Sequence, residues 1–296
     1  MLFFLVAALA LGQGLCFVQL RHRRAYVPSA ALRMQSPNKE TVVVTGLGLI
    51  SPCGSTAPVF FDSLLAGKSG ISKLDRFDAR DFKCQIAGQV RDFDPKAYYR
   101  GKKKIKQNDL YTHFAVAASH IALADAGIDL SAEANTVDAT RVGVIIGSAF
   151  GGMQSFEDAC ADLARGGPGA VQTYTIPMIL GNTAAGIVGM ETGAKGPNFG
   201  VQTACATATH AFGEALRLMR NGDADVMIAG GSEAAITPLS FAGFCNLLAM
   251  NFNYNDNPTE VPPRSICPLS HAAFFFVYLR LRPASSVSFP CLSSLH

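Results

Sequence analysis

A cysteine among small residues is the position in this sequence best suited to nucleophilic chemistry. Cys205 lies in the segment Thr-Ala-Cys-Ala-Thr-Ala-Thr-His, directly after a run from Phe199 to Thr203 that can form a strand. Its neighbours Ala204 and Ala206 leave room for a substrate to approach the thiol. A positioned, activated thiol is what covalent catalysis by cysteine requires.

A helix is predicted directly after the cysteine. Apolar residues recur there every three or four positions, which gives one apolar face: Ala208, Ala211, Phe212, Ala215, Leu216 and Met219. Asn221-Gly222 predicts its end. The N-terminus of a helix favours a thiolate over a thiol, because its N–H groups are free and carry partial positive charge. The alternative is a small, inert cysteine buried at a strand–helix junction.

A second segment supports the nucleophile interpretation. Residues 221–234 read Asn-Gly-Asp-Ala-Asp-Val-Met-Ile-Ala-Gly-Gly-Ser-Glu-Ala. Together with the cysteine segment they closely resemble the nucleophile region of β-ketoacyl-acyl-carrier-protein synthases of the elongating type. Residues 45–52 and 64–71 resemble the opening of the same enzymes, and the resemblance runs from about Thr41 to Val261.

The expected fold is α/β. Strands are predicted at 41–46, 141–147, 199–203 and 224–229, with helices at 58–66, 107–126, 177–192 and after Cys205, and with loop and a short hairpin over 72–106. Alternating strands and helices are typical of a layered α/β unit. The resemblance implies the N-terminal half of a thiolase-like α/β/α fold, with the C-terminal half missing.

The resemblance also implies an activity, that of a 3-oxoacyl-acyl-carrier-protein synthase of type II fatty-acid synthesis. Cys205 would accept an acyl group from a carrier thioester, and its N–H would form half of the oxyanion hole. Malonyl-carrier would then lose CO₂ and lengthen the chain by two carbons. Phosphopantetheine arrives on the acyl carrier protein, so neither a metal nor a diffusible cofactor is implied. A homodimer through the strand beside the nucleophile is also implied.

The resembled enzymes use a Cys-His-His triad, and both histidines, a supporting lysine and a Gly-rich oxyanion loop belong to the missing half. His210 lies five residues after Cys205, roughly 140° around and about 7.5 Å along a helix, so it cannot share a substrate with the thiol. The other histidines fall in the leader, in the helix predicted at 107–126 and in the tail: His22, His113, His120, His271 and His296.

Candidate substrate-binding residues follow the strand predicted at 141–147. Ligands collect at the carboxyl ends of strands in α/β sheets, and Phe150, Gly151 and Gly152 occupy such a loop. The resemblance implies that this loop borders the acyl pocket, where the bulk of Phe150 would limit acyl length. The alternative is that Gly151-Gly152 is only a turn.

A basic cluster is the candidate docking surface for the acidic carrier protein. Arg100, Lys102, Lys103, Lys104 and Lys106 lie within seven residues, and such a patch would steer an acidic partner electrostatically. The alternative is an ordinary solvated start of a helix.

Composition excludes several function classes. The eight cysteines contain no C-x-x-C pair, which argues against a zinc site or a disulfide framework and suits a reducing compartment. Residues 1–39 hold five basic residues and no acidic one, while the remainder holds 20 basic and 22 acidic residues. A nearly neutral body does not suggest nucleic-acid binding.

Both ends of the chain differ in character from residues 41–261, the expected synthase domain. Residues 1–40 are predicted to be a targeting leader: Leu2 to Leu11 is apolar but too short to span a bilayer, and 17–39 is basic and free of acid, like a transit peptide. A signal peptide before a transit-like stretch favours import into a plastid, with plain secretion as the alternative. No membrane span is expected in the mature form.

Residues 262–296 are predicted to be an aberrant tail outside the fold. The resemblance stops after Val261, no Asp or Glu occurs after Glu260, and Ser and Pro dominate toward His296. Such a truncated chain leaves two other functions open. One is a polyketide-type ketosynthase, which shares the cysteine turn; thiolases share the fold but less of this motif. The other is a catalytically incomplete, dimerising relative.

Overall fold

The structure is a computed structural model that describes residues 41–131, 137–261 and 272–281. The predicted targeting leader, residues 1–40, therefore lies outside the described residues. Within the described ranges, no helix is both long and apolar enough to cross a membrane.

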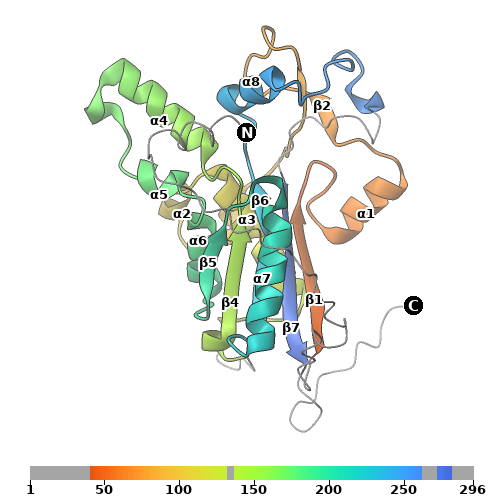
Figure 1. Cartoon of the computed structure of the whole chain (residues 1–296), viewed down its shortest axis with the longest axis vertical. Coiled ribbons are helices and arrows are strands. Elements are labelled where there is room, and N and C mark those ends of the chain that lie inside the picture. The colour runs from red at the N-terminus through yellow and green to blue at the C-terminus, as the bar shows by residue number, and fades with distance from the viewer. Residues whose placement is uncertain (1–40, 132–136, 262–271, 282–296) are drawn as a thin grey trace, which may run out of the picture. The chain divides into compact units, whose positions relative to one another are not determined.

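A five-stranded sheet forms the centre of the fold (Figure 1). Its strands, in spatial order, are β1 (Thr41–Ile50), β7 (Ala272–Leu281), β6 (Val226–Glu233), β4 (Val142–Gly147) and β5 (Asn198–Val201). β4 runs parallel to β5 and to β6, and β7 runs antiparallel to both β6 and β1. Strands β1, β4, β5 and β6 consequently all end at the same edge of the sheet.

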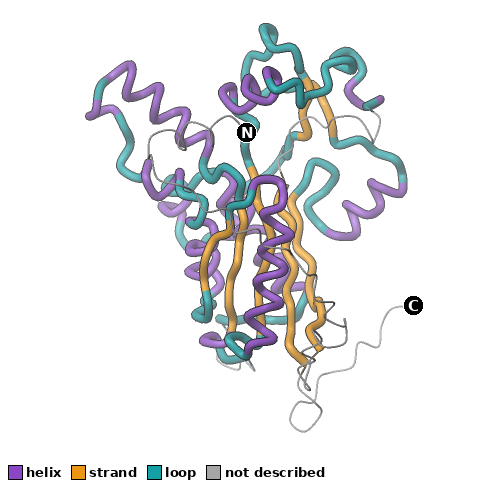
Figure 2. The backbone as a smooth tube through the Cα atoms, viewed as in Figure 1, coloured by secondary structure: helices purple, strands orange, loops and turns teal. Residues whose placement is uncertain are grey.

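Helices cover both faces of this sheet, as alternation along β4 requires (Figure 2). All six residues of β4 are buried. Val144 and Ile146 pack with α3 (Leu110–Asp125) and α6 (Thr183–Thr192), whereas Ile145 faces α7 (Thr207–Asn221). Side chains of a strand alternate between faces, so an apolar strand of this kind needs helices on both sides. The predicted layered α/β fold is confirmed.

Strand β7 differs from the prediction that residues 262–296 lie outside the fold. Ala272–Leu281 pairs with β1 from Thr41↔Leu281 to Ile50↔Ala273 and with β6 along that strand's full length. An extended run of ten residues there satisfies backbone groups of both neighbours, which would otherwise be open edges. Residues 262–271 and 282–296 lie outside the described residues.

The helix predicted over 177–192 is broken into two. The structure has α5 (Thr175–Ile179) and α6, separated by residues 180–182. The Leu180 carbonyl accepts a hydrogen bond from the Tyr111 hydroxyl at 2.5 Å, and a Cβ at Gly181 would lie 1.9 Å from Gln202 Nε2. Contacts with two distant segments therefore interrupt a pattern that is locally helical.

Most other elements match their predictions. The hairpin expected within 72–106 is β2 (Ile71–Lys73) paired with β3 (Ile86–Gly88). Helix α7 ends as predicted, with Gly222 in the left-handed conformation at φ 85°. The other α-helices of the described residues are α1 (Ala57–Leu65), α2 (Lys102–Ile105), α4 (Met153–Gly166) and α8 (Pro238–Asn246).

Candidate functional site

The candidate nucleophile lies on the connection between β5 and α7, at the common end of the parallel strands. Ala204–Ala206 form a short 3₁₀ turn, and Ala204 has a φ of 50°, in the left-handed region that non-glycine residues rarely occupy. Cys205 is exposed on this turn. A buried packing cysteine, the alternative interpretation, does not describe this environment.

Two hydrogen bonds hold the turn in its strained shape. The Thr203 N–H donates to Thr207 Oγ1 at 2.9 Å, and that hydroxyl donates to the Ala204 carbonyl at 2.5 Å. A residue in the left-handed region costs roughly 1 kcal/mol or more and persists only where its surroundings enforce it. Thr207, which is buried beside the cysteine turn, supplies that enforcement and leaves the thiol accessible.

Two glycines let α7 approach the strand ends closely. Gly147 of β4 and Gly231 of β6 are paired in the sheet. A Cβ at Gly147 would lie 2.0 Å from Thr207 Cγ2, and one at Gly231 would lie 2.7 Å from Ala208 Cβ. Larger residues at either position would push the first turn of α7, and with it the cysteine turn, away from the sheet.

The loop that follows β4, residues 148–152, borders the nucleophile strand and is tightly held. Every one of its five backbone N–H groups has an acceptor. Ser148 donates to the Val201 carbonyl at 3.3 Å, Ala149 and Phe150 to the Glu233 carboxylate at 2.8 and 3.3 Å, Gly151 to Ser148 Oγ at 2.9 Å, and Gly152 to the Ile179 carbonyl at 3.4 Å.

The predicted substrate-binding residues thus lie in a packed loop. Gly151 has a φ of 71°, and a Cβ there would lie 2.5 Å from the Ile179 carbonyl oxygen. A Cβ at Gly152 would lie 2.0 Å from the Met178 carbonyl oxygen. The Phe150 ring is 41% exposed and meets Phe244 of α8 edge-on, with centroids 6.1 Å apart. Only glycine permits α5 to lie this close, so Gly151-Gly152 is more than a connecting turn.

Glu233 is a site residue that the sequence interpretation did not single out. It ends β6, and its Oε2 accepts the N–H groups of Ala149 and Phe150 and lies 3.4 Å from Ser148 Oγ. Burial raises the pKa of this carboxyl to about 7, even though the hydrogen bonds favour the ionised form. The signal present in the sequence was an acidic residue directly after an apolar strand.

His210 contacts the loop before the nucleophile. It is exposed on α7, and its Nδ1 lies 2.7 Å from Thr203 Oγ1. This contact places the imidazole beside the residue two positions before Cys205. The other two described histidines, His113 and His120, lie on α3 as predicted.

The structure divides the predicted basic docking cluster. Lys104 Nζ lies 2.7 Å from Glu191 Oε1, and the Arg100 N–H donates to Glu191 Oε2 at 3.1 Å. The Glu191 side chain is only 1% exposed, so Lys104 neutralises a buried carboxylate. Arg100 and Lys106 are exposed, and of Lys102 and Lys103 only the backbone is described.

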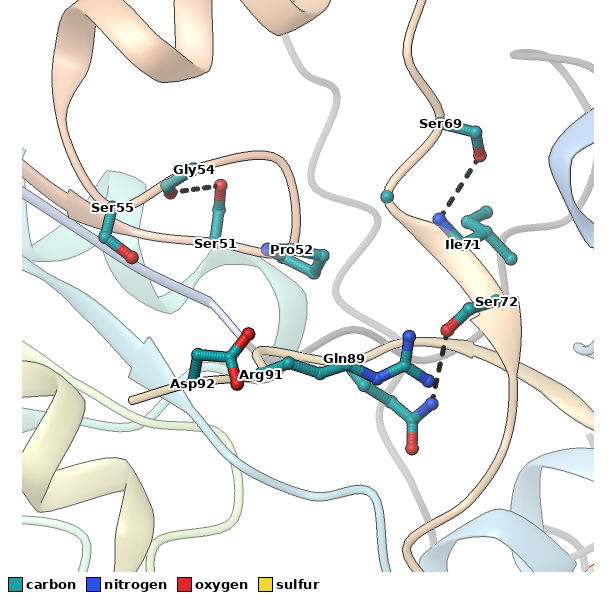
Figure 3. Close-up of a pocket in the computed structure, with 11 residues that line it drawn as sticks. Ser51, Pro52, Gly54, Ser55, Ser69, Ile71, Ser72, Gln89, Arg91 and Asp92 are labelled. Atoms are coloured by element: carbon teal, nitrogen blue, oxygen red, sulfur yellow. Dashed lines mark hydrogen bonds between the residues drawn. The ribbon is translucent and has the colours of Figure 1, made fainter. Parts of the chain in front are cut away.

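A separate hollow lies between the end of β1 and the β2–β3 hairpin (Figure 3). Hydroxyl groups of Ser51, Ser55 and Ser72 line it together with Arg91. The Arg91 guanidinium is bound to Asp75 Oδ2 at 2.7 Å, so its charge is already paired. No predicted site residue lines this hollow, and the described residues contain no cluster of metal-ligating side chains.

Comparisons with known proteins agree with this geometry. A family described as "Beta-ketoacyl synthase, N-terminal domain" matches residues 39–260. The chain is 43% identical over 225 residues to 3-oxoacyl-[acyl-carrier-protein] synthase 2 of Synechocystis sp., covering 76% of this chain and 53% of the relative. It is 35% identical over 249 residues to the chloroplastic 3-oxoacyl-[acyl-carrier-protein] synthase I of Arabidopsis thaliana, covering 82% and 52%.

A solved structure shares the fold. It is a type II polyketide ketosynthase bound to a hexaketide and in complex with its acyl-carrier protein, and it superposes with a TM-score of 0.68 at 26% identity, covering 81% of this chain and 58% of that chain. The chain therefore spans about half the length of the curated relatives that it matches.

Proposed function

This chain belongs to the β-ketoacyl synthase family, and we propose that it takes an acyl group from a carrier thioester onto Cys205 in fatty-acid synthesis. The observation that carries the proposal is the exposed thiol on a strained turn at the start of α7. The turn lies within the segment that matches the family's N-terminal domain.

The proposed first half-reaction takes its nucleophile and one of its oxyanion donors from this chain. The Cys205 thiolate attacks the thioester carbonyl, and the oxyanion that develops is met by the Cys205 N–H. The bond from the carbonyl carbon to the pantetheine sulfur then breaks, and the carrier leaves as a thiol after taking up a proton. The product is an acyl group held on Cys205 Sγ.

The proposed second half-reaction is the condensation of the acyl-enzyme with malonyl-carrier. Malonyl-carrier loses CO₂, and the resulting carbanion attacks the acyl-enzyme, which restores the free thiol and lengthens the chain by two carbons. The resembled family assists decarboxylation with two histidines from its C-terminal half. We assign that step to the whole synthase, since residues 39–260 match the family's N-terminal domain.

The acyl chain is proposed to lie against the 148–152 loop, where Phe150 limits its length. An acyl carrier protein is the proposed partner, since a solved relative is a ketosynthase in complex with its carrier. Arg100, Lys102, Lys103 and Lys106 are the proposed docking residues. Lys104 contributes less, because its charge is paired with Glu191.

Assembly and location are also proposed. Strand β5 is the end strand of the sheet, so its outer backbone groups are available to pair with a second copy of the chain, which supports a homodimer. A plastid location is proposed from the basic, acid-free leader and from a relative described as chloroplastic.

Acyl loading tests the proposed function. Incubation with an acyl-carrier thioester is expected to add one acyl group to the peptide that contains Cys205, as mass spectrometry of a digest would show. Cys205→Ala should abolish the adduct, whereas Cys160→Ala, which removes another exposed thiol, should leave it. Absence of any adduct on Cys205 would contradict the proposal and favour a non-catalytic relative.

A polyketide-type ketosynthase is the second candidate, favoured by the solved polyketide ketosynthase with the same fold. The two candidates differ in the acyl group that they accept. Faster loading from saturated acyl-carrier than from a β-keto or polyketide thioester would support fatty-acid synthesis, and the opposite preference would support the second candidate.

A further inference from the structure

Glu233 connects two strand ends of the sheet through a single carboxylate oxygen. Its Oε2 accepts hydrogen bonds from Ala149 at 2.8 Å and Phe150 at 3.3 Å, two consecutive N–H groups of the 148–152 loop. The remaining three N–H groups of the loop have backbone acceptors or Ser148 Oγ. The shape of the loop around Phe150 therefore depends on one side chain from the neighbouring strand.

This carboxylate is retained at a cost. Its Oε1 is buried and has no hydrogen-bond partner among the described residues, and an unsatisfied buried polar atom is unfavourable. An apolar side chain at the end of β6 would avoid that cost but would leave the N–H groups of Ala149 and Phe150 without their acceptor. The two accepted N–H groups thus offset the cost of the unpaired oxygen.

The Phe150 side chain has weak support of its own. The ring is 41% exposed, and it approaches Phe244 edge-on. An aromatic pair of this kind contributes about 0.5–1.5 kcal/mol beyond burial. The backbone bond to Glu233 therefore adds a second restraint, on the position of the Phe150 backbone.

We propose that Glu233 is a positioning residue that holds the 148–152 loop so that Phe150 limits the length of the acyl chain reaching Cys205. This inference rests on the proposed function and deepens it by naming what sets the limit. The acceptor oxygen, and not the negative charge, performs this role, because the donors that it meets are neutral: the N–H groups of Ala149 and Phe150 and the Ser148 hydroxyl.

Alkylation of Cys205 by short and long maleimides tests the inference without requiring acyl transfer. N-ethylmaleimide and N-dodecylmaleimide would be compared on the full chain, with labelling at Cys205 resolved from Cys53 and Cys160 by peptide mass spectrometry. The readout is the ratio of the long-chain rate to the short-chain rate. Glu233→Ala is expected to raise this ratio about tenfold, the scale on which a hydrophobic pocket discriminates a few methylenes.

Two further variants separate positioning from charge and from folding. Glu233→Gln keeps an acceptor oxygen and loses the charge, so its ratio should stay within about twofold of the parent. Glu233→Asp keeps the charge but withdraws the acceptor, so its ratio should rise as in Glu233→Ala. If the Glu233→Ala chain does not fold, the Glu233→Asp ratio alone tests the inference. Asp138→Ala is the control, because Asp138 also accepts a backbone N–H, from Thr140, but before the start of β4.

The outcomes are distinguishable. An unchanged ratio in Glu233→Asp, or a Gln variant that behaves like the Ala variant, would overturn the positioning role. A ratio that rises only in Glu233→Ala and Glu233→Asp supports it. If the parent chain shows this pattern with maleimides but takes no acyl group from a carrier thioester, the loop inference stands and the proposed function fails.

Discussion

At the scale of single residues, the fold holds two residues of the site in unfavourable states, one of backbone conformation and one of side-chain burial. Ala204 occupies the left-handed region so that Cys205 is exposed, and Thr207 enforces that turn through two hydrogen bonds. Glu233 keeps one buried carboxylate oxygen without a partner in the described part of the chain, while the other accepts two N–H groups. In both cases local stability is lost where the proposed chemistry needs a defined geometry.

His113 provides a test of the same trade-off on another element, helix α3. Its Nδ1 lies 2.9 Å from the Tyr99 hydroxyl, and burial lowers its pKa from 6.5 to about 4. Because the folded pKa is depressed, the folded state resists the proton that the unfolded chain binds below pH 6.5. Stability is therefore present above pH 6.5 and lost as the pH falls toward 4.

We expect the free energy of unfolding to fall by about 2 kcal/mol more in the parent than in His113→Gln between pH 7.5 and pH 5. Urea unfolding at the two pH values measures this difference, provided that the dependence of the unfolding free energy on urea concentration stays the same. His210→Gln changes an exposed histidine and is the control. Identical pH dependence of the parent and His113→Gln would show that His113 does not titrate as inferred.

At the scale of elements, close contacts between helices and strand ends build the site. α7 rests on Gly147 and Gly231, and α5 rests on Gly151 and Gly152. Each contact leaves no room for a Cβ, so the cysteine turn and the 148–152 loop are positioned by backbone approach as well as by side chains. The break between α5 and α6 has the same origin, since Gly181 faces Gln202 just before the cysteine turn.

The close contact between α7 and the strand ends can be tested by adding a single methyl group. A Cβ at Gly147 would lie 2.0 Å from Thr207 Cγ2, so Gly147→Ala must displace the first turn of α7. We expect a loss of about 1–3 kcal/mol in unfolding free energy, the usual cost of overpacking, and slower acyl loading of Cys205. Thermal unfolding and peptide mass spectrometry measure the two effects.

Gly213→Ala is the matched control on the same helix, because nothing lies within 4 Å of a Cβ there. That substitution should leave loading unchanged and stabilise the helix by roughly 0.5–1 kcal/mol. If Gly147→Ala has the same acyl-loading rate and thermal unfolding as the parent, the close contact between α7 and Gly147 does not position the nucleophile.

At the scale of the whole molecule, the sheet depends on a strand from the far end of the described chain. β7 lies between β1 and β6, so the first strand is joined to the remainder of the sheet through residues more than 220 positions away. The prediction that this segment lies outside the fold was wrong for 272–281. The Ser and Pro residues that dominate the end of the chain follow an apolar run that is long enough to form a strand.

Deletion of residues 262–296 is therefore expected to abolish cooperative unfolding and to cause aggregation, because β1 and β6 would both expose open edges. Deletion of residues 282–296 retains β7 and is the control, which should unfold like the parent. Urea unfolding and size-exclusion chromatography compare the three chains. A cooperative, monodisperse 1–261 chain would contradict the role of β7.

The sequence alone was sufficient for features that arise within a few consecutive residues. The strand, small-residue turn and helix around Cys205, and the glycine that ends α7, follow from hydrophobic period and capping preferences, which act locally. The layered α/β class follows as well, since the order of strands and helices restricts the possible packings. Family resemblance added the chemistry of the cysteine to this local pattern.

Only the tertiary structure decided contacts between distant positions. Glu233 reaches the loop at Ala149 across 84 residues, and Lys104 reaches Glu191 across 87. Nothing near Lys104 in the sequence distinguishes it from the lysines around it, and an acidic residue after a strand does not indicate which N–H groups it will accept. Burial and partner choice arise only when separate segments pack, so no local pattern encodes them.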